Sequence, residues 1–111
     1  MLTLRFKMIK KTNTNTLDEF NRITITTIKQ NNKLKKFALN LSCKIQGKWY
    51  AVYRVDNYHG FLHEQKLWRS NQPLPLQEEK YISLMAAMKH HFLKISEEYE
   101  KYRWYFERSL E

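Results

Sequence analysis

The sequence predicts an α+β fold in which an antiparallel β-meander of four to five strands packs against one long C-terminal α-helix. In the first 70 of the 111 residues, apolar and polar residues alternate, as in half-buried strands. After residue 75 the apolar residues recur every three or four positions, as on one helix face. Between the two patterns, NQPLP holds both prolines of the chain. We therefore expect a single domain, with the sheet in residues 1–70 and the helix in residues 75–109.

The N-terminal part is expected to begin with a strand in LTLRFKMI, residues 2–9, because its apolar residues occupy alternate positions. TNTNT, residues 12–16, is composed of turn formers and is interpreted as a connector. A capping box of Thr16 and Glu19 predicts a short helical turn at 17–20. The β-branched RITITTIK, residues 22–29, then predicts a second strand.

The middle of the chain is expected to continue the meander through three more strands. KFALNLSCKI alternates strictly, KWYAVYRV is rich in aromatic and β-branched residues, and FLHEQKLW resumes the pattern. Tight turns are predicted between the strands, at Asn31–Asn32, Gln46–Gly47 and Asn57–Gly60.

The C-terminal segment carries one continuous apolar seam, with spacings of four and three residues in alternation. Pro75 suits the first helical position. At about 1.5 Å per residue, some 33 residues give a rod of about 50 Å, which would overhang the sheet and favour a homodimer or a protein partner. The alternative is a seam buried wholly against its own sheet. His90 and His91 fall off the seam and are expected to face solvent. The seam consists of Tyr81, Met85, Met88, Phe92, Ile95, Tyr99, Tyr102 and Phe106.

The net charge of +9 resides entirely in the first half of the chain. Residues 1–50 hold eleven Lys or Arg against Asp18 and Glu19, whereas the remaining residues hold nine of each sign. Such asymmetry is typical of a surface that binds polyanions, with RNA favoured here, although DNA, an acidic protein or solubility alone would also explain it. The expected nucleic-acid-binding residues are Arg5, Lys7, Arg22, Lys33, Lys35, Lys36 and Lys48, with Tyr58 and Trp68 stacking on bases.

Composition also argues against several classes of protein. A single cysteine, Cys43, excludes an internal disulfide and a multi-cysteine zinc site. No apolar run approaches the roughly 20 residues of a membrane span, and the N-terminus alternates where a signal peptide would be continuously apolar. We expect a cytoplasmic protein that needs no cofactor and does not associate with membranes.

The segment RVDNYHGFLHEQ, residues 54–65, gathers an arginine, an aspartate and two of the four histidines. His59 and His63 have the spacing of a helical zinc pair, but Gly60 and the β-rich flanks disfavour a helix, and four extended residues span about 13 Å. A hairpin is favoured instead. A four-residue loop would place Asp56 opposite Phe61 and Arg54 opposite His63, whereas a three-residue loop would pair Tyr53 with His63.

In the four-residue arrangement the cluster suits metal-independent RNA cleavage. His63 and His59 would act as general acid and base on the 2′-hydroxyl and the phosphate. Arg54 would stabilise charge developing on the phosphate, and Asp56 would orient a histidine. The structural alternative is that Asp56 caps the turn, Arg54 pairs with it and His59 occupies the loop tip.

This segment also resembles a known family. Residues 48–68 resemble small uncharacterised prokaryotic proteins with an Arg-x-Asp-x-x-His-Gly-x-x-His core between two strands and a C-terminal helix; Arg54, Asp56, His59, Gly60 and His63 are the matching positions. They are more distantly similar to the TumE-like toxins of toxin–antitoxin pairs, whose histidine-rich run is reduced here to His63. The resemblance implies a toxin-like ribonuclease neutralised by an antitoxin partner. The alternatives are a non-catalytic nucleic-acid-binding module and a subunit that binds proteins through the C-terminal helix.

Overall fold

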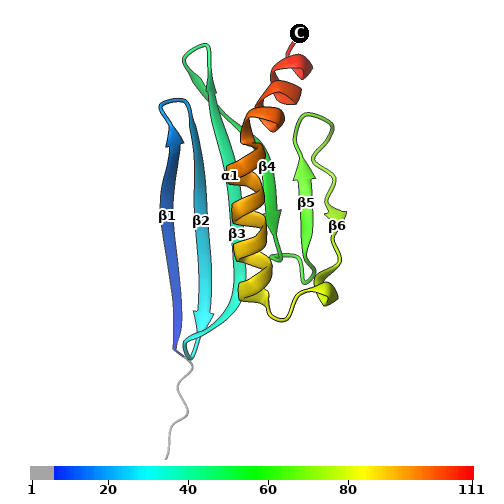
Figure 1. Ribbon diagram of the computed structural model, residues 1–111. Helices are drawn as coiled ribbons and strands as arrows, with labels where there is room; N and C mark the ends of the chain where they lie inside the picture. Colours follow the sequence, from blue (N-terminus) through cyan, green and yellow to red (C-terminus); the bar gives the residue numbers. More distant parts are fainter. Residues whose placement is uncertain (1–6) are drawn as a thin grey trace, which may run out of the picture.

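The computed structural model describes residues 7–111 and shows a six-stranded antiparallel sheet with one long helix on one face. The strands follow one another in chain order across the sheet, so the predicted meander and the α+β class are confirmed (Figure 1). Six strands replace the expected four to five. They are β1 (Met8–Asp18), β2 (Asn21–Gln30), β3 (Lys33–Ile45), β4 (Lys48–Asp56), β5 (His63–Lys66) and the short β6 (Leu74–Pro75).

The N-terminal hairpin differs from the sequence prediction. TNTNT lies within β1 and is not a connector, and residues 17–20 contain the end of β1 and a two-residue turn instead of a helical turn. Threonine pairs stabilise this strand, since Thr12 lies opposite Thr26 with their hydroxyls 3.4 Å apart. Asp18 makes the turn by accepting hydrogen bonds from the backbone N–H of Phe20 at 2.8 Å. The strand expected from residue 2 lies largely outside the described residues.

Two of the three predicted tight turns, at Asn31–Asn32 and Gln46–Gly47, are confirmed. Asn31 and Asn32 both have positive φ, and so do Gln46 and Gly47, as two-residue hairpins require. The β2–β3 turn and the β3–β4 turn lie at opposite ends of the sheet (Figure 1).

The helix α1 (Leu84–Ser109) begins nine residues later than the expected start at residue 75. Pro75 instead pairs with His63 at the sheet edge, and Ser83 caps the helix by accepting from the backbone N–H of Ala86 at 3.1 Å. Its 26 residues span about 39 Å, close to the roughly 43 Å of the 13-residue β3, along which it lies. The predicted overhang is therefore not present, and the homodimer stays a prediction.

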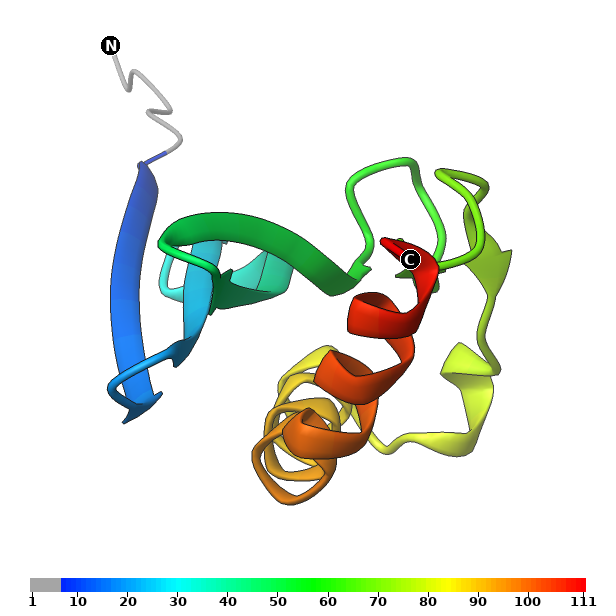
Figure 2. The same cartoon turned by 90° about the horizontal axis from the view of Figure 1, so that it is seen from above.

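The core lies between α1 and the face of β2, β3 and β4 that it covers, while β1 stands beyond the helix (Figure 2). Ile95, Tyr102 and Phe106 of the predicted seam are buried, and the other seam residues pack against the core. The prediction for His91 was wrong: it is only 5% exposed, because Ala87, His91 and Ile95 form one row on the inner face of α1. No helix in residues 7–111 is long and apolar enough to span a membrane.

Arg103 and Tyr99 connect α1 to the far hairpin. The Arg103 guanidinium donates to the carbonyl oxygen of Lys44 at 2.8 Å and to the side-chain oxygen of Asn21 at 3.1 Å. The Tyr99 hydroxyl donates to Asp18 at 2.9 Å. These contacts join the helix to β1, β2 and β3.

Candidate functional site

The loop that joins β4 to β5 holds the histidine segment, and its register differs from both predicted hairpins. Asp56 lies opposite His63, and Arg54 lies opposite Gln65, so the connection is six residues long. The four-residue loop and its three-residue alternative are both wrong. Gly60 does adopt the predicted left-handed conformation, with φ of +86°.

Asn57 explains the longer loop. Its side chain accepts from the backbone N–H of Phe37 at 2.9 Å and donates to the carbonyl oxygen of Lys35 at 3.1 Å. The chain therefore stays attached to β3 for one residue beyond the end of β4 before it can turn. Sequence reasoning treated Asn57 only as a turn former and missed this role in the register.

Arg54, Asp56 and His63 nevertheless share one face, as expected, and it is the face turned away from α1. Asp56 is the centre of the cluster. Its carboxylate is ion-paired with Nε of Arg54, accepts from the backbone N–H of Tyr58 at 2.8 Å, and lies 3.2 Å from Nε2 of His63. Arg54 also donates to the side chain of Asn40 at 3.0 Å. Asp56 caps the turn and pairs with Arg54, which is the structural alternative considered from the sequence.

His63 is completely buried, and Asp56 is 1% exposed. The Nδ1 atom of His63 lies 3.1 Å from the carbonyl oxygen of Phe61, and its Nε2 faces the Asp56 carboxylate outside hydrogen-bond alignment. His63 therefore has no exposed atom that could contact RNA in this conformation.

His59 is exposed, and its ring centroid lies 5.2 Å from that of His63. The estimate of about 13 Å for an extended segment does not apply, because His59 lies in the loop and folds back over β5. Within residues 7–111 there is no group of three or more His, Cys, Asp or Glu side chains arranged to hold a metal ion.

The predicted nucleic-acid-binding residues are spread over both faces. The half-buried Tyr58 has Lys36 and Arg54 each 5.7 Å from its ring centre. Arg22 lies 3.8 Å over the ring of Trp49 on the face away from α1. Lys48 lies at the opposite end of the sheet from Lys36, Trp68 packs on the α1 side, and Arg5 lies outside the described residues.

One end of the sheet gathers most of the positive charge of the N-terminal half. It comprises the start of β1, the end of β2 and the start of β3, which are adjacent in the sheet (Figure 1). Asp18 and Glu19 lie at the opposite end, in the β1–β2 turn. No ion pair joins the lysines of this end to any acidic residue of the described chain. We call this set the basic end: Lys7, Lys10, Lys11, Lys29, Lys33, Lys35 and Lys36.

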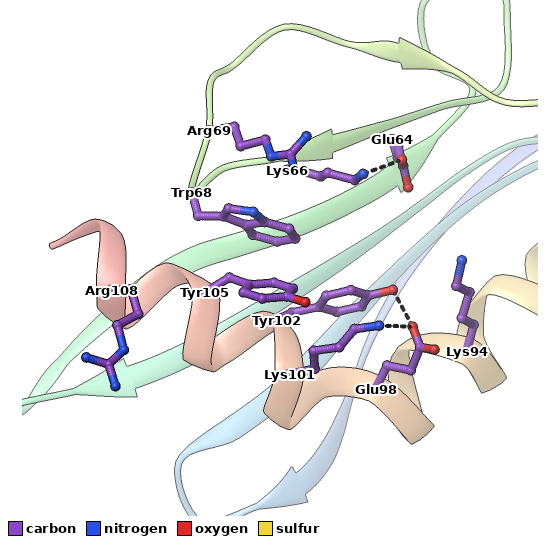
Figure 3. Close-up of a pocket in the computed structure, with 10 residues that line it drawn as sticks. All are labelled: Glu64, Lys66, Trp68, Arg69, Lys94, Glu98, Lys101, Tyr102, Tyr105 and Arg108. Atoms are coloured by element: carbon purple, nitrogen blue, oxygen red, sulfur yellow. Dashed lines mark hydrogen bonds and ion pairs between the residues drawn. The ribbon is translucent and has the colours of Figure 1, made fainter.

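A groove of about 570 Å³ lies between α1 and the chain that follows β5 (Figure 3). Trp68 projects from the β5 side, with Tyr102 and Tyr105 on the α1 side, and the ring centroids of Trp68 and Tyr105 are 5.4 Å apart. Two carboxylates, Glu64 and Glu98, lie at its other end. Its cations are Lys66, Arg69, Lys94, Lys101 and Arg108.

Sequence reasoning placed only Trp68 of this groove in a binding role. The signal was available in the helix, because Lys94, Glu98, Lys101, Tyr105 and Arg108 repeat at spacings of four and three residues beside the apolar seam. From the sequence alone, such a row of residues is interpreted as the solvent-exposed side of a helix. It forms a groove only because the fold places the β5 side opposite it.

The groove carboxylates are held by tyrosines. The Tyr102 hydroxyl donates to Glu98 at 2.8 Å, which lowers the pKa of that carboxyl, and burial followed by this hydrogen bond raises the pKa of Tyr102. The Tyr53 hydroxyl donates to Glu64, which lies 3.5 Å from Lys66. Burial and then this bond raise the pKa of Tyr53. Glu98 is therefore a charged acceptor at neutral pH.

Comparison with known proteins gives a family but no activity. A family model described as a domain of unknown function (DUF7718) matches residues 8–111. The chain belongs to this family. The match spans every strand and the helix, so the DUF7718 domain includes the groove and all of the basic end except Lys7. No curated protein and no solved structure matches the chain. The resemblance to the TumE-like toxins stays a prediction.

Proposed function

We propose that this protein binds single-stranded RNA through the basic end of its sheet. The observation that supports this is the set of seven lysines without an ion-pair partner in residues 7–111, gathered at one end while the acids of the same half lie at the other. Each phosphate that a lysine neutralises releases counterions, so such a set favours a polyanionic ligand. The histidine loop borders this end, since Asn57 is bonded to Lys35 and Tyr58 lies beside Lys36.

Fluorescence anisotropy of a labelled single-stranded RNA tests the proposal. If four phosphates are contacted, affinity should fall about 50-fold between 50 and 200 mM salt, from a slope of about −0.7 per phosphate. Charge reversal by Lys35→Glu with Lys36→Glu should weaken binding at least tenfold. Lys44→Glu with Lys48→Glu changes the net charge equally at the opposite end of the sheet, beside the β3–β4 turn, and serves as the matched control.

Equal losses in the two double variants would show that binding follows net charge alone and would reject the basic end as the site. A DNA strand of the same sequence, measured in parallel, separates preference for RNA from preference for any single strand. Tighter binding of DNA would overturn the assignment to RNA.

A toxin-like, metal-independent ribonuclease is the second proposal, favoured by the exposed His59 ring near His63 and by the 29% exposed side chain of Arg54. The burial of His63 argues for RNA binding without cleavage there. Cleavage of RNA in EDTA by the wild type, lost in His59→Ala and in His63→Ala variants that remain folded, would support catalysis. Intact RNA, or equal cleavage by all three proteins, would reject it.

A further inference from the structure

The groove beside α1 has a composition that the basic end lacks. Five cations and two carboxylates line it, giving a net charge of +3, and three aromatic rings form one of its ends. The basic end offers positive charge with only Tyr58 nearby. The groove therefore suits a ligand that combines several negative charges with an aromatic ring. The volume of the groove, about 570 Å³, is within the range of small-molecule sites.

The aromatic end of the groove is rigid before any ligand arrives. Tyr53, Tyr102 and Trp68 form a continuous stack, with ring centroids 4.5 Å apart for the two tyrosines and 5.6 Å for Tyr102 and Trp68. Tyr105 is 38% exposed and tilts by 40° against Trp68, so it presents an open ring surface. A planar base can stack there without separating the buried rings.

The cations that remain available lie on opposite walls. Lys66 and Lys101 each have a glutamate within 4 Å, and Arg108 pairs with Glu111 at 3.3 Å. Arg69 and Lys94 have no ion-pair partner in the described chain. Arg69 projects from the β5 side near Trp68, and Lys94 projects from α1 near Glu98 (Figure 3). Phosphates that extend from the aromatic end along the groove would therefore meet positive charge from both walls.

We propose that this groove binds a nucleoside di- or triphosphate, with the base on Tyr105 and Trp68 and the phosphates between Arg69 and Lys94. A charge of about −3 to −4 on such a ligand complements the +3 of the lining. Glu64 and Glu98, at the end away from the base, accept hydrogen bonds from the sugar hydroxyls. The site does not depend on RNA binding at the basic end.

Calorimetric titration with ADP, adenosine and pyrophosphate in EDTA-containing buffer tests the proposal. ADP should bind at least tenfold more tightly than either fragment, because only ADP meets both ends of the groove. Adenosine or pyrophosphate binding as tightly as ADP would overturn it, and so would no binding of ADP at millimolar concentration.

Variants locate the site. Arg69→Gln with Lys94→Gln should weaken ADP binding about tenfold. Tyr105→Leu should weaken it about five- to tenfold, whereas Tyr105→Phe should retain wild-type affinity because the ring is kept. Lys48→Gln with Lys89→Gln is the charge-matched control, and Lys35→Gln with Lys36→Gln tests independence from the basic end. Equal losses in all the double variants would overturn the assignment to the groove.

Discussion

The histidine loop and the basic end lie side by side, yet their polar groups are arranged in opposite ways. In the loop, Asp56 and His63 are buried and meet several protein partners. At the basic end, exposed lysines such as Lys33, Lys35 and Lys36 pair with no acid of residues 7–111. Buried, partnered charges hold a structure together, whereas exposed, unpartnered charges are available to a ligand. We therefore expect Asp56 and His63 to stabilise the fold and the exposed lysines to bind the ligand.

The largest expected effect comes from Asp56. Asp56→Ala removes the common partner of Arg54, His63 and the Tyr58 N–H, and should lower the free energy of unfolding by about 3–5 kcal/mol. Urea unfolding monitored by circular dichroism measures this change. Asp56→Asn keeps the shape and should show a smaller loss, and the exposed Glu19→Ala is the control. If Asp56→Ala lowers the free energy of unfolding no more than Glu19→Ala does, the Asp56 cluster does not stabilise the fold.

His91 extends the comparison to a buried histidine that is not paired with an acid. Burial, and then the positive charges of His90, Lys94 and Lys80, lower the pKa of His91 from 6.5 to about 4. Its Nε2 lies 3.2 Å from the Tyr81 hydroxyl, and its Nδ1 is buried without a partner in the described chain. Folding therefore favours the neutral ring.

The protein should become less stable as the pH falls below 6.5 because of His91. Above pH 6.5, His91 is neutral in both the folded and the unfolded chain, and it does not reduce the free energy of unfolding. As the pH falls from 6.5 towards 4, His91 becomes protonated in the unfolded chain but stays neutral in the folded chain, so the free energy of unfolding decreases. The decrease in the free energy of unfolding reaches up to about 3 kcal/mol. In urea unfolding at pH 7 and pH 4.5, His91→Leu should lose less stability than wild type on acidification. His90→Leu removes one of the charges but keeps the burial of His91, which is the larger cause, so it should show most of the wild-type loss. Parallel pH profiles for wild type and His91→Leu would contradict the assigned cause.

The sequence predicts the architecture well because hydrophobic periodicity determines it locally. The strands around Phe37–Ile45 and Lys48–Val55, their two-residue turn and the helical seam all follow from alternation and from i, i+3 and i+4 spacing. The failures occur where distant contacts override local preference. Thr12 to Thr16 form a strand because β2 offers matching partners, and Pro75 pairs at the sheet edge instead of starting the helix.

The candidate sites were less predictable for the same reason. Arg54, Asp56 and His63 were correctly placed on one face, but their register depends on Asn57 reaching back to β3. The burial of Asp56 and His63 could not be read from the pattern, since an aspartate in particular is rarely buried unless it is paired. The groove requires Trp68 and the polar flank of α1 to meet, and residues so far apart in the chain are brought together only by the fold.

The smallest expected effect on stability comes from the exposed lysines of the basic end. Lys35→Gln with Lys36→Gln should leave the free energy of unfolding within about 0.5 kcal/mol of wild type, because neither side chain has an ion-pair partner in the described chain and Asn57 bonds only to the backbone of Lys35. The same variant should reduce the salt slope of RNA binding by about 1.4, which corresponds to two phosphate contacts. Urea unfolding and anisotropy on one preparation measure both. A loss of stability with an unchanged salt slope would assign these lysines to the structure and reverse the division between loop and basic end.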